Sequence, residues 1–229
     1  TAAFNRDVSS FFEKWCEDME DAQFDDGRIP HVAPNPFRDD KGRSGGGGGQ
    51  AAWADAVVIC PWMIYLCYGD KRILENRYES MKKFVDWRAE TAKNYIHKEA
   101  VFGDWLAIDI PGGECSGSPT PKDLIATAYM AKTTEILSKV ANILGKTEDD
   151  KKYATLLKKI KSAFNDEFVS PSGRILGDTQ ASYLLALDFD LLDAEKRKAA
   201  GLNLIKTIDK WKGHLATGFV GTPLLAPVL

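Results

Sequence analysis

The distribution of apolar residues along the chain predicts an all-α protein. Through most of its length, apolar residues recur every three or four positions, which places them on one face of a helix. The expected helices cover residues 4–23, 51–68, 73–92, 122–144, 147–168, 179–187 and 194–211, with another beginning after Pro223. The helix over 51–68 is apolar nearly all round, so we expect other helices to enclose most of its surface.

The links between the expected helices alternate in length. Those after the first, third, fifth and seventh helices are long and contain Pro or Gly, whereas those after the second, fourth and sixth are short. Helices joined by short links run antiparallel, so the long links should leave the scaffold at one end, where function is usually carried. This pattern predicts an (α/α) toroid of antiparallel helical hairpins. An open solenoid of helix pairs is the alternative, although no repeat of about 34 or 40 residues is present.

The stretch Gly103-Asp104-Trp105 lies in the link after the third expected helix and is a candidate sugar site. A Trp face offers apolar surface to the C–H side of a sugar ring, and a neighbouring carboxylate accepts hydrogen bonds from ring hydroxyls. The alternative is structural: a turn glycine, a capping Asp and a half-buried core Trp. The residues alone leave both interpretations open.

Composition narrows the classes of partner. The chain has 229 residues, enough for one large domain or two small ones. With 44% hydrophobic and 28% charged residues, it has the composition of an ordinary soluble globular protein. Its net charge of −3, with Lys and Arg spread along the expected helices, argues against nucleic acid as a partner. No apolar run reaches the roughly 18 residues that a membrane-spanning helix needs.

No pattern in the sequence indicates a metal or a cofactor. The four cysteines lack paired C-x-x-C spacing and are expected to be small buried hydrophobes: Cys16, Cys60, Cys67 and Cys115. The glycine run at 45–49 is not followed by Lys-Ser or Lys-Thr, so it does not predict a phosphate-binding loop. Dinucleotide, zinc-protease and serine-hydrolase motifs are also absent. We therefore predict no cofactor and no metal.

Several short motifs occur in a fixed order along the chain: Ala2-Ala3-Phe4-Asn5, Asp25-Asp26-Gly27-Arg28-Ile29-Pro30, Trp53-Ala54-Asp55-Ala56, Tyr68-Gly69-Asp70, Gly103-Asp104-Trp105-Leu106 and Thr217-Gly218-Phe219-Val220-Gly221-Thr222-Pro223. As an ordered set they resemble the catalytic domain of bacterial α-L-rhamnosidases, glycoside hydrolase family 78, over essentially the whole chain. The resemblance implies a six-hairpin toroid that hydrolyses terminal α-L-rhamnose with inversion. The expected partner is therefore a carbohydrate that contains terminal rhamnose.

The resemblance also implies that the acid–base pair lies outside this chain. Inversion needs one carboxyl group to protonate the leaving oxygen and another to activate water. In the family the acid lies just before the position of Thr1, and the base lies on a loop beyond Leu229. The start without Met and the apolar end at 223–229 likewise suggest a fragment, so we expect one helical domain, 1–229, that is part of a larger catalytic domain. The 229 residues alone are expected to be inactive.

Five residues form the expected substrate-binding set: Trp53, Asp55, Asp104, Trp105 and His214. The resemblance implies that Trp53 and Trp105 contact rhamnose, with a core position as the alternative for Trp53. Asp55 could bind a sugar hydroxyl or cap a helix, and His214 could line the site or pack its loop. If the chain were active alone, a catalytic carboxylate could come from Asp109, Glu114 or Asp178, but their spacing singles out none of them.

Other functions and properties follow less directly. A different toroidal glycosidase or a polysaccharide lyase is the second enzyme hypothesis, and a helical-repeat binding module without chemistry is the third. An incomplete toroid would expose apolar helix flanks, which predicts self-association of the fragment. The compartment is unknown from the residues. The family resemblance favours a periplasmic or secreted protein, with a cytoplasmic one as the alternative.

Overall fold

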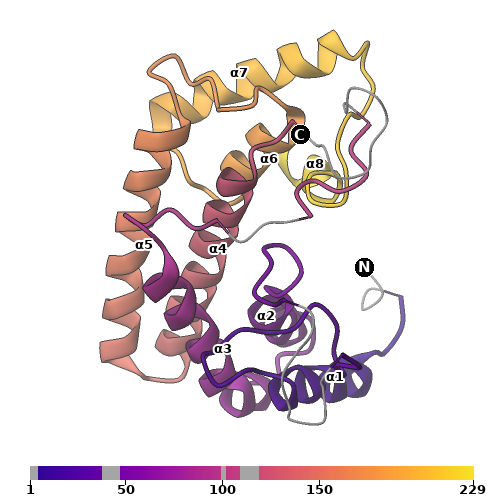
Figure 1. Cartoon of the computed structure of the whole chain (residues 1–229), viewed down its shortest axis with the longest axis vertical. Helices are drawn as coiled ribbons and strands as arrows, with labels where there is room; N and C mark the ends of the chain where they lie inside the picture. The colour runs from indigo at the N-terminus through magenta and orange to yellow at the C-terminus, as the bar shows by residue number, and fades with distance from the viewer. Residues whose placement is uncertain (1–4, 38–46, 99–101, 109–118) are drawn as a thin grey trace. The chain divides into compact units, whose positions relative to one another are not determined.

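The computed structural model describes residues 5–37, 47–98, 102–108 and 119–229, and these residues form helices and links (Figure 1). The helices are α1 (Ser9–Asp21), α2 (Ala56–Tyr68), α3 (Arg72–Thr91), α4 (Lys122–Ile143), α5 (Thr147–Phe168), α6 (Gln180–Asp188), α7 (Ala194–Lys210), a 3-10 turn η2 (Thr222–Leu224) and α8 (Leu225–Val228). In the described ranges there is no β-strand beyond isolated bridges. The all-α class is therefore confirmed. No described helix is long and apolar enough to cross a membrane.

The first helix begins later than its apolar pattern predicts. The sequence placed its start at Phe4, which lies outside the described residues, but Asn5 to Val8 are not helical. The Asp7 carboxylate accepts a hydrogen bond from Ser9 N at 3.1 Å. Val8 N donates to the hydroxyl of Tyr68 at 2.9 Å. These contacts hold the chain in a turn, so α1 starts at Ser9.

The second helix also differs from its prediction, in both start and burial. Residues 51–55 form turns instead of helix, because Ala52 has a φ of 71° and donates its N–H to the Asp55 carboxylate at 2.7 Å. The expectation that other helices enclose most of α2 is wrong for its C-terminal half. Met63 is 43% exposed and Leu66 is 55% exposed. An apolar sequence shows which surface could be buried but not whether a neighbour covers it.

The described residues divide into two compact units. The first contains the described residues up to Thr91 together with Thr133–Leu157, and the second contains Ala92–Lys132 and Lys158–Leu229. The division falls within α4 and α5, so each of these helices contributes residues to both units.

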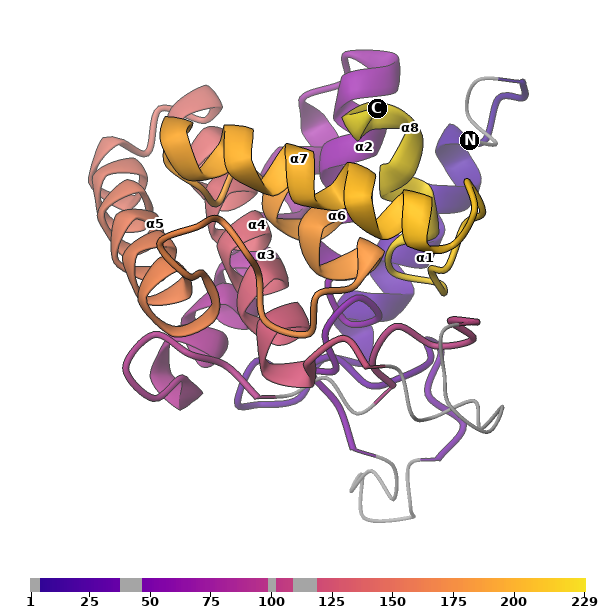
Figure 2. The same ribbon diagram turned by 90° about the horizontal axis from the view of Figure 1, so that it is seen from above.

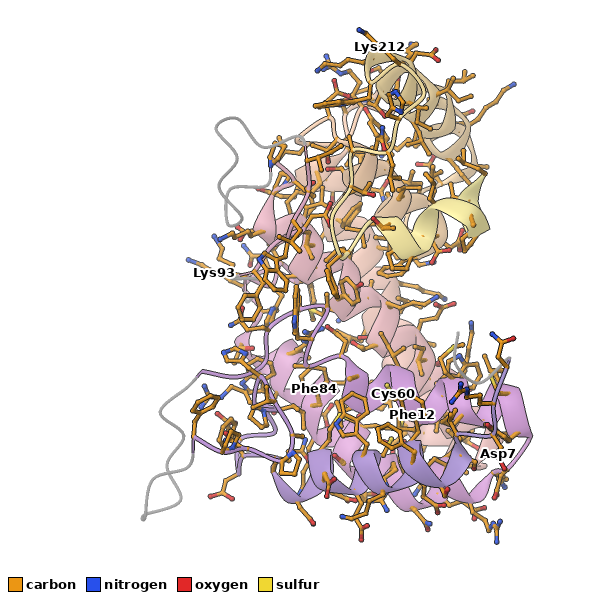
Figure 3. The ribbon with its side chains drawn as sticks, turned by 90° about the vertical axis from the view of Figure 1, so that its right-hand side faces the viewer. Asp7, Phe12, Cys60, Phe84, Lys93 and Lys212 are labelled. Carbon is orange, nitrogen blue, oxygen red and sulfur yellow. The ribbon has the colours of Figure 1, made fainter. Side chains whose placement is uncertain are left out.

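The core of the first unit is built from α1, α2 and α3 with parts of α4 and α5. Helices α1, α2 and α3 contact one another pairwise, as their grouping in Figure 1 shows. Apolar side chains from these helices fill the space between them, and Figure 3 labels Phe12 and Phe84 there. Fully buried members of this core include Val58, Leu74, Met81, Phe84, Leu137, Val140 and Tyr153.

Polar contacts at the edge of this core connect α3 to the start of α5. The hydroxyl of Tyr78 donates to Asp149 at 2.8 Å, and that of Tyr153 donates to Asp86 at 3.0 Å. The tight link before α5 depends on Gly145, whose φ of 72° is the left-handed conformation expected of a residue after a helix end. The predicted short hairpin turn between α4 and α5 is thus confirmed.

The second unit brings the long links after α3, α5 and α7 together. The side chains of Thr120 and Thr179 are hydrogen-bonded at 2.7 Å, which joins the first two links. Gln180 joins the third, since its amide nitrogen donates to His214 O and its amide oxygen accepts from Ala216 N, both at 3.0 Å. Figure 2 shows α7 beside α6, whose residues Gln180–Leu187 are all buried. Within this unit, the predicted gathering of these links is confirmed.

The cysteines only partly follow their prediction. Cys16 is buried, Cys60 is half-buried and Cys67 is exposed, and all three are free thiols. Burial raises the pKa of Cys16 to about 12 and that of Cys60 to about 11, so both stay protonated near neutral pH. The expectation of burial is wrong for Cys67, which lies on the exposed face of α2. Cys115 lies outside the described residues.

Burial predicts different costs for two leucines of the first unit. Leu74→Ala should lower the free energy of unfolding by about 2–5 kcal/mol, because Leu74 is 0% exposed and its truncation leaves a cavity. The matched change Leu66→Ala should cost less than about 1 kcal/mol, because Leu66 is largely exposed. Urea unfolding of both variants measures the difference. Equal losses would contradict this assignment of the core.

Candidate functional site

A buried carboxylate organises the candidate site of the second unit. Asp104 is 1% exposed, and its oxygens accept hydrogen bonds from three backbone N–H groups of the 217–221 loop. The N···O distances are 2.9 Å for Gly218, 2.8 Å for Val220 and 3.1 Å for Gly221. Burial raises the pKa of the Asp104 carboxyl above its ordinary value, and the three amide donors oppose that shift. The three amides take up most of the acceptor capacity of Asp104, and its contact with a sugar stays a prediction.

The 217–221 loop lies directly against the Gly103–Ala107 stretch. Phe219 N donates to the carbonyl oxygen of Trp105 at 2.8 Å. A Cβ atom on Gly218 would lie 2.2 Å from the same oxygen, so only glycine allows this approach. Leu106 adopts a φ of 63° at the turn. Two links that are far apart in sequence are therefore locked together by backbone contacts.

This locking presents two aromatic rings to solvent. Trp105 is 39% exposed and Phe219 is 61% exposed, and their ring centroids lie 5.7 Å apart with an interplanar angle of 38°. Neighbouring apolar side chains are also exposed, at 47% for Leu106 and 63% for Ile108. Exposed aromatic faces of this kind suit the C–H faces of sugar rings. Trp105 is therefore exposed and not a half-buried core residue, and its contact with a sugar stays a prediction.

In the first unit, Trp53 lines a cavity of about 200 Å³. The other lining residues are Trp15, Met19, Ile29, Pro30, His31, Val32, Ala33 and Ala56. Burial lowers the pKa of the His31 imidazole, which favours its neutral form, a donor at one nitrogen and an acceptor at the other. Apolar walls with a few polar groups are typical of a small-ligand site.

Asp55 lies two residues after Trp53, but its carboxylate does not face solvent. It is 0% exposed and forms a two-pronged ion pair with Arg88, at 2.5 Å and 3.1 Å. One of its oxygens also accepts from Ala52 N. It makes no hydrogen bond that caps α2. The contacts assign Asp55 a part in holding the turn that carries Trp53, and direct contact with a sugar stays a prediction.

Arg88 is a buried residue of this site that no sequence motif singles out. Its position on α3 continues the buried stripe of Met81, Phe84 and Val85, and Arg88 itself is 0% exposed. A charged side chain at a core position requires a buried partner of opposite charge. A charged residue on the buried stripe of α3 therefore indicates an ion pair in the core. The sequence alone does not say which acidic residue is the partner of Arg88.

The remaining candidate residues that the structure describes are not part of the contacts around Asp104 or Asp55. The side chain of His214 is exposed, while its backbone carbonyl accepts the hydrogen bond from Gln180. Asp178 accepts from the hydroxyl of Tyr183 at 2.5 Å and pairs with Arg174 at 2.9 Å. Asp109 and Glu114 lie outside the described residues. In the part of the chain that the structure describes, no group of His, Cys, Asp and Glu side chains could hold a metal ion.

The structure therefore contains two sets of candidate residues, each within one unit. Asp104 and Trp105 meet the 217–221 loop in the second unit, where His214 belongs to the link that leads into this loop. Trp53 and Asp55 lie in the first unit with Arg88 and His31. Phe219 is not among the expected substrate-binding residues, although it lies in the Thr217–Pro223 motif.

In the described residues, helical hairpins are joined by links that carry exposed aromatic side chains, an arrangement suited to the class of all-α proteins that bind carbohydrate. Within that class, the chain belongs to the bacterial α-L-rhamnosidase family, because the model of its six-hairpin glycosidase domain matches residues 1–229. The predicted (α/α) hairpin fold is the fold of this family.

Curated relatives agree with this assignment. An α-L-rhamnosidase of Formosa agariphila is 39% identical over 231 residues, which cover 100% of this chain and 24% of that protein. One of Streptomyces avermitilis is 36% identical over 100% of this chain and 21% of that protein. The chain thus spans about a quarter or less of the length of these relatives.

Solved structures show the same likeness. The structure of the Streptomyces avermitilis α-L-rhamnosidase complexed with L-rhamnose matches with a TM-score of 0.86 and 35% identity, over 97% of this chain and 20% of that chain. The α-L-rhamnosidase of Dictyoglumus thermophilum matches with a TM-score of 0.87 and 32% identity, over 100% of this chain and 25% of that chain.

The three hydrogen bonds to Asp104 lead to a stability prediction. Asp104→Asn keeps one acceptor oxygen but turns an amide N–H₂ group toward amide donors, so at least one buried N–H loses its partner. We expect the free energy of unfolding to fall by about 1–3 kcal/mol. The control Asp209→Asn, at an exposed position of α7, should change it by about 0.5 kcal/mol or less. Urea unfolding tests both, and a tolerated Asp104→Asn would show that the loop does not depend on this carboxylate.

Proposed function

We propose that the protein to which this chain belongs is an inverting glycoside hydrolase that releases terminal α-L-rhamnose from glycans or glycosides. The observation that carries the proposal is the match of the whole chain to the rhamnosidase six-hairpin domain. The relatives named α-L-rhamnosidase favour rhamnose over the substrates of other toroidal glycosidases or lyases. A non-catalytic binding module is disfavoured by the same match.

In this proposal the chain supplies binding surface and not the acid–base pair. Trp53 and the Trp105–Phe219 pair provide aromatic faces for the sugar. The carboxylates of Asp55 and Asp104 are buried and already accept hydrogen bonds from Arg88 and backbone amides, and Asp178 is paired with Arg174. An acid that delivers a proton and a base that activates water must both reach the substrate. We place both on parts of the catalytic domain other than these 229 residues.

Three further properties belong to the same proposal. The 229 residues form part of one larger (α/α) catalytic domain, the reaction uses no cofactor, and the protein is periplasmic or secreted. The first is supported by the share of the relatives that the chain covers. The location follows from family resemblance alone, and cell fractionation with an antibody to this chain tests it. Recovery of the protein only from the cytoplasm would overturn that location.

Turnover by the whole protein tests the proposed activity. It should hydrolyse an aryl α-L-rhamnoside and leave an aryl glucoside untouched, whereas the isolated 229 residues should hydrolyse neither. Trp105→Ala in the whole protein should lower kcat/KM by roughly 2- to 10-fold, the loss expected when one aromatic contact is removed. Phe11→Ala, which truncates a 66% exposed ring on α1, serves as the control and should leave kcat/KM unchanged. Glucoside turnover without rhamnoside turnover would overturn the proposal.

Exposed apolar side chains predict that the isolated chain self-associates. Met63 and Leu66 on α2, and Leu202 and Ile205 on α7, are each between 43% and 55% exposed. Surfaces of this kind associate in water to bury apolar area. The weight-average sedimentation coefficient should rise with protein concentration, and Leu202→Lys should reduce that rise. A concentration-independent monomer would contradict the prediction.

A further inference from the structure

Arg88 connects α3 to the turn that precedes α2. Besides its ion pair with Asp55, its guanidinium donates to the carbonyl oxygen of Gly49 at 3.3 Å. Gly49 and Asp55 bound the segment that contains Trp53, so one buried side chain contacts both ends of this segment. Within it, the N–H of Ala52 is bound by Asp55. Three of the contacts that hold the segment 49–55 therefore depend on Arg88, either directly or through Asp55.

The surroundings of Gly49 show how little freedom this segment has. Gly49 adopts a φ of 78° and donates its N–H to Ile29 O at 2.8 Å. A Cβ atom at this position would lie 2.1 Å from the indole ring of Trp87 on α3. The side chain of Arg88 also stacks on Phe84, with its guanidinium carbon 4.6 Å from the ring centroid. The start of the turn therefore packs closely against α3, beside Trp87 and Arg88.

Stability alone does not account for an arginine at this position. A buried ion pair recovers its desolvation cost only when every polar atom has a partner, and apolar residues of similar volume often serve as well or better. The Nε atom of Arg88 is buried without a hydrogen-bond partner, which adds a further cost. The arrangement is more useful for placing the turn than for strengthening the core.

We propose that Arg88 is a positioning residue for substrate binding: acting through Asp55 and Gly49, it sets the place of Trp53 in the wall of the 200 Å³ cavity. The inference rests on the proposed glycosidase function, since it assigns the Trp53 indole to the sugar. Arg88 touches no substrate itself. Its effect reaches the cavity because Trp53 lies between Ala52, whose N–H the buried carboxylate binds, and Asp55, which carries that carboxylate.

A paired substitution in the whole protein tests this role. Arg88→Met with Asp55→Asn keeps apolar packing on Phe84 and an acceptor for Ala52 N, but removes the link from α3 to both ends of the segment. On an aryl α-L-rhamnoside we expect KM to rise about 10-fold, with kcat within about 2-fold of the parent. Lys82→Met is the matched control: it removes another ion pair of α3, with Asp149 at 3.0 Å, and should leave KM unchanged.

Combination with Trp53→Ala separates positioning from general support of the fold. If Arg88 acts through Trp53, adding the paired substitution to Trp53→Ala should raise KM no further, because the positioned ring is already gone. If the KM increases of Trp53→Ala and of the paired substitution multiply in the combined variant, the proposal is overturned. Arg88→Lys keeps the charge and loses the two-pronged geometry, so its KM should lie between those of the parent and the paired variant. If the paired variant does not fold, the KM of Arg88→Lys tests the positioning role instead. A KM equal to that of the parent protein would then overturn this role.

Hydrogen exchange distinguishes a failure of this inference from a failure of the proposed function. The paired variant should exchange the amides of residues 49–55 at least about 10-fold faster than the parent, with or without turnover. If the parent does not hydrolyse the rhamnoside but exchange is faster in the variant, the glycosidase function is overturned. The conclusion that Arg88 holds residues 49–55 in place then still stands. Parental exchange rates in the variant would overturn the positioning role itself.

Discussion

A buried carboxylate needs hydrogen-bond donors from the protein. The turn that carries Trp53 and the loop packed against Trp105 both depend on this constraint. Asp104 and Asp55 are almost completely excluded from water, so each must find hydrogen-bond donors within the protein. Asp104 finds them in the amides of the 217–221 loop, and Asp55 finds them in Arg88 and the amide of Ala52. In each case the hydrogen bonds that offset the cost of burying the charge also hold the neighbouring link.

Rigid links of this kind are suited to presenting aromatic rings. A loop that moved freely would lose conformational entropy when a sugar bound, whereas a link already held by several hydrogen bonds loses less. The glycines contribute through close approach: a side chain at Gly218 would collide with the Trp105 carbonyl, and one at Gly49 with the Trp87 ring. Glycine and buried carboxylate therefore act together, since one permits the contact and the other maintains it.

Much of the scaffold could be predicted, because helical periodicity and link length are local properties. The helices near 122–144, 147–168 and 194–211 begin and end within about one residue of their expected bounds. The errors fall where a distant side chain competes with the local pattern. The hydroxyl of Tyr68 holds Val8 outside α1, and Asp55 binds Ala52 N in a turn where the apolar run suggested helix.

By itself, the sequence determined the all-α class, the alternation of long and short links, the family and the presence of Trp53, Asp104 and Trp105 in the segments of interest. Only the tertiary structure decided what these residues contact. The partner of Asp55 lies 33 positions away, and the first donor to Asp104 lies 114 positions away. Such pairings depend on which faces of the helices pack together. No local pattern records that packing, so only the tertiary structure shows that Asp55 and Asp104 hold the links that carry the aromatic residues.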